Sequence, residues 1–262
     1  MTGAMLLAID SGNTNVVCAV YAGDELRGSW RAATNPNRTA DEYAVWLIQM
    51  MALAGLAPSD IDAAIIGSVV PEATFNLVRL CQRYFASEPL IVGRPDCHIG
   101  ISIDLDMPKE EVGADRVANA VAAQDRYRPP LIVLDFGTAT TFDVVDRHGN
   151  YCGGVIAPGI NLSLRALDMA AAQLPRIGIR RPPTVVGRST VPAMQSGVFW
   201  GYVGLVEGLV QRIRAERGEA MDVIATGGLA PAIAEATDII TQVDPTLTLW
   251  GLRLIYRRNS NQ

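Results

Sequence analysis

Two short polar stretches in this chain have the residue types that bind nucleotide phosphates. The first is residues 10–15, Asp-Ser-Gly-Asn-Thr-Asn, which directly follow the apolar run at residues 5–9. Glycine lets backbone N–H groups approach phosphate oxygens, and an aspartate can hold a hydrated Mg²⁺ ion. The second is residues 135–141, Asp-Phe-Gly-Thr-Ala-Thr-Thr, after the apolar run 131–134. Either turn alone is also typical of an ordinary hairpin, but the pair predicts a nucleotide bound between two phosphate turns.

A third candidate, Gly113-Ala114-Asp115-Arg116, lies between the two turns and opens an alanine-rich helix predicted over residues 117–125. Asp115 could accept the proton of an alcohol that attacks the γ-phosphoryl group of ATP, because in a loose transition state the base mainly orients the hydroxyl and takes its proton late. Arg116 could bind an anionic group of the acceptor. The alternatives are that Asp115 only stabilises the helix N-terminus and that Arg116 forms a surface ion pair.

Two further segments could contact the same ligands. Thr226-Gly227-Gly228 follows a predicted strand and opens a Pro-started helix, so its glycines could let the backbone lie flat against the adenine or ribose of a nucleotide. A plain strand-to-helix turn is an equally good interpretation of these three residues. Thr190 stands at the start of a helix predicted over residues 191–216, where it could cap the helix and contact a substrate.

The elements that must position these residues repeat within the chain. The pattern of the first half predicts three strands, an amphipathic helix at 41–54, a strand at 61–70, a Pro-started helix and a short strand. The second half repeats the three strands, then has a long helix, another strand and a second Pro-started helix. An insertion at 157–190 interrupts the second half, and loops of this length are often functional. The repeat predicts two similar α/β halves.

Glycines recur on the predicted long helix at a spacing of four, three and four residues: Gly197, Gly201, Gly204 and Gly208. Each glycine costs a helix roughly 1 kcal/mol relative to alanine. We therefore expect another helix to pack closely along this face, either within the chain or across a dimer.

The composition limits the class of protein. With 262 residues and 49% hydrophobic content, the chain can form one large domain or two closely associated ones. A net charge of −5 disfavours nucleic-acid binding, which needs a basic face. We expect no membrane span and no signal peptide, because the apolar runs are short and the N-terminal one lacks a basic region. Four scattered cysteines and two histidines predict no structural zinc site, and free cysteines suit a reducing cytoplasm.

At residues 10–15, 113–116, 135–141 and 226–228 the chain resembles type III pantothenate kinases, which belong to the actin-like, sugar kinase and Hsp70 ATPase superfamily. The resemblance implies an α/β fold of duplicated ribonuclease-H-like (actin-like ATPase) domains, with mixed five-stranded sheets flanked by helices. We expect an N-terminal half at 1–115 and a C-terminal half at 116–262 that carries the acceptor-site insertion. The implied activity is ATP-dependent phosphorylation of pantothenate to 4′-phosphopantothenate, the first step of coenzyme A biosynthesis.

The resemblance also implies a role for each motif. Asp115 is the proton acceptor, Asp135 binds a monovalent cation (potassium or ammonium), and Asp10 most simply serves Mg-ATP through water. Pantothenate is bound by Gly113, Ala114, Asp115, Arg116 and Thr190. ATP is bound by the first turn, the strand after it and one threonine of the second turn: Asp10, Ser11, Gly12, Asn13, Thr14, Asn15, Val16, Val17 and Thr138. We add Gly227 and Gly228 to the ATP site, and expect a cytoplasmic homodimer.

One departure from the family pattern concerns the acceptor. Many members carry an aromatic residue shortly before the Gly-Ala-Asp-Arg element, whereas residues 103–108 contain none, and Leu105 stands nearest its place. The alternatives are therefore a kinase of another small hydroxy acid or sugar, and a catalytically degenerate nucleotide-binding regulatory protein. A degenerate protein should lack a phosphate turn or the base, whereas Asp10, Asp115 and Asp135 are all present.

Overall fold

The computed structural model describes residues 4–170, 175 and 177–260, which form two compact units. The first unit runs to Arg126 and also takes the chain from Thr246 onward, while the second is Tyr127–Pro245. The division predicted from the repeat, 1–115 and 116–262, differs from these units: the helix that begins at Ala114 and the last helix of the chain both belong to the first unit.

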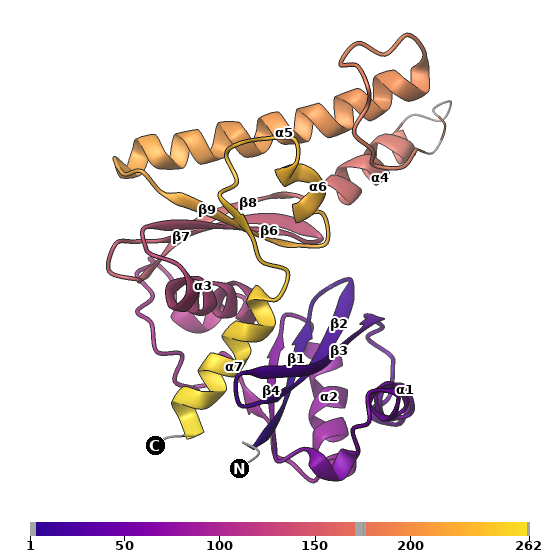
Figure 1. Ribbon diagram of the computed structural model, residues 1–262, viewed down its shortest axis with the longest axis vertical. Coiled ribbons are helices and arrows are strands. Elements are labelled where there is room, and N and C mark those ends of the chain that lie inside the picture. Colours follow the sequence, from indigo (N-terminus) through magenta and orange to yellow (C-terminus); the bar gives the residue numbers. More distant parts are fainter. Residues whose placement is uncertain (1–3, 171–174, 176, 261–262) are drawn as a thin grey trace. The chain divides into compact units, whose positions relative to one another are not determined.

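A mixed five-stranded sheet forms the centre of the first unit, in the order β3-β2-β1-β4-β5 (Figure 1). Strand β1 pairs antiparallel with β2 and parallel with β4, and β5 is parallel to β4. The strands are β1 (Met5–Ser11), β2 (Asn15–Ala22), β3 (Glu25–Ala33), β4 (Ala63–Ser68) and β5 (Leu90–Ile91). Along the chain these strands follow one another as predicted for the first half, whereas their order in the sheet was not predicted.

Helices α1 (Ala40–Leu53) and α2 (Pro71–Tyr84) cover one face of this sheet. Helix α1 begins with a capping box, in which Thr39 Oγ1 accepts the Glu42 backbone N–H while the Glu42 carboxylate accepts the Thr39 N–H. The core on this face contains the odd-numbered residues of β1, such as Leu7 and Ile9. Since side chains alternate along a strand, Asp10 faces the other side of the sheet.

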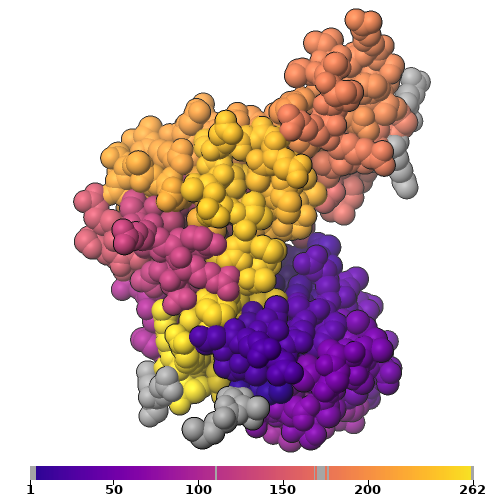
Figure 2. Space-filling model, in the orientation of Figure 1, coloured from indigo at the N-terminus to yellow at the C-terminus, as the bar shows by residue number. Residues whose placement is uncertain are grey.

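The opposite face is covered by α3 (Ala114–Arg126) and the C-terminal helix α7 (Leu247–Ser260), which pack against each other. Their axes approach closely at Gly251, where an added Cβ would lie 2.5 Å from the carbonyl carbon of Ala118. Helix α7 is also fixed by the buried Arg253, which donates to the Gly23 carbonyl and pairs with Asp24. The yellow C-terminal helix accordingly lies against the indigo N-terminal residues in Figure 2.

The second unit repeats the sheet, with the order β10-β9-β6-β7-β8. Its strands are β6 (Leu131–Phe136), β7 (Ala139–Val145), β8 (Tyr151–Pro158), β9 (Asp222–Gly227) and β10 (Gln242–Val243). Strand β6 is antiparallel to β7 and parallel to β9, as β1 is to β2 and β4. The same pairing in both units confirms the predicted duplication and the α/β fold class.

The helices of the second unit are α4 (Ile160–Ala170), α5 (Thr190–Arg217) and the short α6 (Ala230–Ala234). Helix α5 packs on the sheet through Phe199, Val206 and their neighbours. The predicted insertion at 157–190 is helical in part, since it contains α4, while its residues 171–174 and 176 lie outside the described part of the chain. No helix within the described ranges is both long and apolar enough to cross a membrane.

Candidate functional site

The first predicted phosphate turn is a tight hairpin between β1 and β2. Its two ends are held by a hydrogen bond from the Gly12 N–H to the Asn15 carbonyl, 2.9 Å, and Thr34 Oγ1 donates to the Gly12 carbonyl at 2.6 Å. Asn13 and Thr14 are exposed at the tip of the turn. The hairpin therefore presents backbone and short polar side chains to solvent, as a phosphate turn requires.

Residues on either side of the tip differ in what they can offer a ligand. The Val16 side chain is fully buried in the core, so only its backbone is available, whereas Val17 is half-buried. The Ser11 hydroxyl is buried, and its Oγ has no hydrogen-bond partner among the residues that the structure describes. A buried hydroxyl without a partner is costly, which makes Ser11 a candidate donor to a bound oxyanion.

Strand pairing brings the acceptor motif beside this turn. Asp10 is the register partner of Gly67 on the parallel strand β4, so both residues have their side-chain positions on the same face. The Ala114 Cβ lies only 3.6 Å from where a Cβ on Gly67 would stand. The first turn of α3 thus lies over β4, one strand away from Asp10 and on the face to which Asp10 points.

Asp115 is a half-buried residue in the first turn of α3. Its Oδ1 accepts the Arg116 backbone N–H at 2.8 Å, which is the helix-end role that the sequence left open as an alternative. The same oxygen lies 2.6 Å from the position that a Cβ on Gly113 would take, so this orientation needs glycine there. No described residue donates to Oδ2, which leaves that oxygen able to accept a proton from a substrate.

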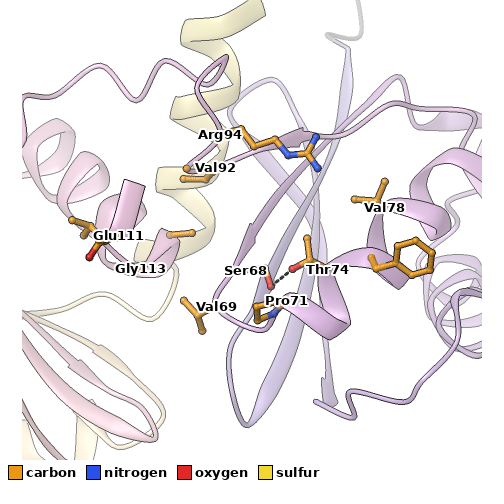
Figure 3. A pocket seen from close by; sticks show the side chains of 13 residues that line it. Ser68, Val69, Pro71, Thr74, Val78, Val92, Arg94, Glu111 and Gly113 are labelled. Atoms are coloured by element: carbon orange, nitrogen blue, oxygen red, sulfur yellow. Dashed lines mark hydrogen bonds between the residues drawn. The ribbon is translucent and has the colours of Figure 1, made fainter. Parts of the chain in front are cut away.

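A cavity of about 710 Å³ adjoins the acceptor motif within the first unit (Figure 3). Its walls come from the end of β4, the first turns of α2, the segment after β5 and the residues that lead into α3, among them Gly113 and Ala114. Most of the lining is apolar, with the charged side chains Arg94 and Glu111. This cavity is not predicted from the sequence: the strand-loop-helix pattern at 67–71 recurs in the second half, but nothing local marks it as the wall of a cavity.

The second predicted turn joins β6 to β7 in the second unit. The Gly137 N–H donates to the Ala139 carbonyl at 3.0 Å, and the Thr138 carbonyl accepts the Gly159 N–H at 3.1 Å. Thr140 is buried and hydrogen-bonds the Tyr202 hydroxyl of α5. Burial raises the pKa of Tyr202, so its phenol stays protonated and helps to hold the turn on the helix.

Gly227 lies next to the aspartate of this second turn. It is the register partner of Phe136, has φ of +90°, and an added Cβ would stand 2.8 Å from Asp135 Oδ1. Gly228, by contrast, has no described atom within 4 Å of its Cβ position. Asp135, Thr138, Gly227 and Gly228 therefore gather at one end of the second sheet, although α6 beyond them has only five residues.

Three other features singled out in the sequence are Thr190, Leu105 and the glycines of α5. Thr190 is exposed and is the first residue inside α5, whereas the residue at the cap position is Ser189, so Thr190 does not cap the helix as predicted. Leu105 is half-buried and does not line the cavity. The Cβ positions of Gly197, Gly201 and Gly204 on α5 meet no described atom within 4 Å outside the helix's own backbone, so no described helix of this chain packs closely there.

Metal sites built from several side chains are not found in the described ranges, where no group of three His, Cys, Asp or Glu residues could hold an ion. Asp10 and Asp135 are each a single, half-buried carboxylate at the end of a strand. A single carboxylate suits Mg²⁺ that is held mainly by nucleotide phosphates and water. The donor set therefore fits ions that arrive with a ligand or are completed by backbone oxygens.

Comparisons of the sequence with known proteins agree on one family. The sequence profile described as type III pantothenate kinase matches residues 6–212. A type III pantothenate kinase from Rhodospirillum rubrum is 67% identical over 255 residues, which cover 97% of this chain and 99% of that protein. One from Paramagnetospirillum magneticum is 66% identical over 256 residues, which cover 98% of each.

Solved structures share the fold at low sequence identity. A conserved Baf family protein from Campylobacter jejuni has a TM-score of 0.63 at 18% identity, over 98% of this chain and all of that one. The ethanolamine utilization protein EutJ from Carboxydothermus hydrogenoformans has a TM-score of 0.57 at 13% identity, over 97% of this chain and 91% of that one. At these identities the likeness concerns the fold alone.

Proposed function

The chain belongs to the type III pantothenate kinase family, and we propose that it transfers the γ-phosphoryl group of ATP to the primary hydroxyl of pantothenate. The product is 4′-phosphopantothenate, and the reaction is the first step of coenzyme A biosynthesis. The observation that carries the proposal is that Asp10 pairs in register with Gly67, and that Ala114, the first residue of α3, lies against Gly67. Asp10 of the first phosphate turn and the first turn of α3, which carries the half-buried Asp115, therefore lie over the same face of one sheet.

In the proposed reaction Asp115 orients the acceptor hydroxyl and removes its proton. The hydroxyl oxygen forms a bond to the γ-phosphorus while the bond from that phosphorus to the bridging oxygen of ADP breaks, and the proton passes to Asp115. Because the transition state is loose, the proton moves late and positioning contributes most of the rate. The free Oδ2 and the fixed Oδ1 of Asp115 support this role.

We propose that ATP contacts residues 10–17 and also Thr138, Gly227 and Gly228. The open space at Gly228 and the unpartnered Ser11 hydroxyl support contacts to a ligand there. Asp10 would hold Mg²⁺ through water, and Asp135 would bind potassium or ammonium. When bound, these cations would neutralise the charge that develops on the phosphates.

On the acceptor side, the proposal assigns Gly113, Ala114, Arg116 and Thr190 to pantothenate. The guanidinium of Arg116 suits an anionic or carbonyl oxygen. Leu105, where the family pattern has an aromatic residue, offers an aliphatic surface instead, and this favours testing other hydroxy acids and sugars beside pantothenate.

We further propose that the protein acts as a cytoplasmic homodimer. The Cβ positions of Gly197, Gly201 and Gly204 on α5 meet no described atom within 4 Å, and the neighbouring insertion exposes large apolar side chains such as Leu162, Val185 and Val186. Helix backbones approach closely at small residues, and exposed apolar patches mark association sites. A second copy of the chain would cover both features.

A coupled assay for ADP tests the activity directly. Purified protein with Mg-ATP and K⁺ should consume ATP only when pantothenate is added, and an acceptor panel in the same assay separates pantothenate from other hydroxy acids and sugars. No turnover with pantothenate over a wide range of concentrations would refute the proposal, and faster turnover with another acceptor would replace the substrate.

The role of Asp115 has its own test. Asp115→Asn keeps the shape of the side chain and removes the base, so we expect kcat to fall by about 10²- to 10⁴-fold while ATP binding stays unchanged. The matched control is Asp96→Asn, the same change at an exposed loop residue outside the cavity lining, which should leave kcat unchanged. Similar activity of the two variants would remove Asp115 from the mechanism.

A further inference from the structure

The large cavity of the first unit has a polar arrangement that the proposed roles do not use. It adjoins Gly113 and Ala114 but extends away from them between α2 and the segment after β5. Val69, Val78, Val92 and Val112 contribute to its apolar walls, and the exposed ring of Phe75 stands at its edge. A volume of about 710 Å³ is within the range of small-molecule sites. The cavity is thus large enough for a small molecule that has one end near Gly113 and Ala114, the residues just before Asp115.

Arg94 is the only basic side chain among the described residues that line this cavity. It is exposed, and no described residue forms an ion pair or hydrogen bond with its guanidinium. In Figure 3 it extends from the segment after β5 toward helix α2, on a different wall from Glu111 and Gly113. A guanidinium without a partner can bind a carboxylate through two parallel hydrogen bonds without first breaking an existing ion pair.

The two charged side chains that line the cavity, Arg94 and Glu111, give its two ends opposite charge. Glu111 is two residues from Gly113 in the chain, so the negative side chain belongs to the end at which Asp115 stands. Arg116, which follows Asp115, does not line the cavity and already takes part in another interaction. Within the lining, an acceptor carboxylate is therefore repelled by Glu111 and attracted to Arg94. The other polar lining residues do not compete, because Thr74 Oγ1 donates to Ser68 Oγ at 2.7 Å and both hydroxyls are used in the β4–α2 loop.

We propose that Arg94 binds the carboxylate of the acceptor and so determines specificity for a hydroxy acid over a neutral alcohol. This inference rests on the proposed function and deepens it. Pantothenate has a hydroxyl at one end, a carboxylate at the other and a largely apolar chain between them. With the hydroxyl at Asp115, its two methyl groups and methylene carbons lie along the valine-lined walls and its carboxylate meets Arg94. The position of Arg94, rather than Leu105, which does not line the cavity, then limits which acceptors are used.

The test compares two acceptors that differ only in charge. One is pantothenate, and the other is its alcohol analogue, in which a hydroxymethyl group replaces the carboxylate. We measure kcat/KM for both with saturating Mg-ATP in the parent protein and in Arg94→Ala. Because a hydrogen-bonded ion pair is lost, the variant should lose about 10- to 100-fold for pantothenate and less than about twofold for the alcohol. The preference of the parent for the acid would then disappear.

Two further variants serve as controls for the effect of Arg94→Ala. Arg94→Lys keeps the charge but not the planar pair of donors, so it should recover part of the preference. Arg27→Ala removes an exposed arginine on β3 that does not line the cavity, and should change neither acceptor. Because no described residue pairs with the Arg94 guanidinium, the melting temperature of Arg94→Ala should equal that of the parent.

Three outcomes overturn the inference: an unchanged preference in Arg94→Ala, an equal loss for both acceptors, or an effect confined to the KM for ATP. If the parent turns over neither acceptor, the proposed function fails, and calorimetric binding of the same two compounds decides on Arg94 separately. In that case tighter binding of the acid that Arg94→Ala abolishes supports the site, and its absence refutes it.

Discussion

The contact between α3 and α7 gives a prediction whose size follows from one glycine. In Gly251→Ala, the new methyl carbon would overlap the Ala118 carbonyl oxygen, and it would stand 2.5 Å from the carbonyl carbon and 2.9 Å from the Cα of that residue. Ordinary carbon contacts need about 3.5–4.0 Å, so the two helices must separate by roughly 1 Å. Both partners are helix backbone and cannot rotate away. Overpacking of this kind costs about 1–3 kcal/mol, and the gain in helix propensity, about 1 kcal/mol, offsets part of it.

We therefore expect Gly251→Ala to lower the free energy of unfolding by about 1–2 kcal/mol, which corresponds to roughly 2–8 °C in melting temperature for a chain of this size. Helix α3 carries Asp115 in its first turn, so a displaced α3 should also lower kcat, whereas KM for ATP should change less. Thermal unfolding by calorimetry and the coupled ADP assay measure the two effects.

The control is Gly178→Ala, the same chemical change at a position where no described atom lies within 4 Å of the new methyl group. Its melting temperature should stay within about 1 °C of the parent. If Gly251→Ala melts at the parent temperature and turns over at the parent rate, the close packing of α3 on α7 is not the constraint inferred here.

Three other predictions concern separate parts of the chain. Gly227→Ala should destabilise the protein because of its positive φ and the contact with Asp135, whereas Gly228→Ala should leave melting unchanged and raise KM for ATP; unchanged KM would remove Gly228 from the ATP site. The hydrogen bonds from Thr39 lower the pKa of Glu42. The contribution of Glu42 to folding stability is therefore present above the ordinary carboxyl pKa and is lost as pH falls through the lowered pKa. Melting curves of Glu42→Ala and the parent should thus differ at neutral pH and converge in acid, and a constant difference would contradict this. Gly201→Leu should dissociate the proposed dimer in sedimentation experiments, and unchanged assembly would refute contact along α5.

Local chemistry made much of the fold predictable. The capping box of α1 uses residues three apart, Thr39 and Glu42, and Gly55 follows the helix end with φ of +74°, as expected for a helix stop. Buried strands, polar hairpins and Pro-started helices recur in the same order in both halves, so the duplication could be inferred from pattern alone. The family resemblance then suggested the proposed roles that spacing leaves open, such as the different cations at Asp10 and Asp135.

What the sequence determined by itself was the set of elements and the chemical identity of the motifs, because turns, caps and periodicity depend on neighbours within a few residues. Tertiary structure decided which motifs meet. Parallel pairing of β1 with β4 sets Gly67 between Asp10 and Ala114, and α7 returns from the far end of the chain to pack on α3 at Gly251. These contacts depend on long-range strand register and on the shapes of packed backbones, neither of which any local pattern encodes. For the same reason the cavity that carries Arg94 became visible only in the folded chain.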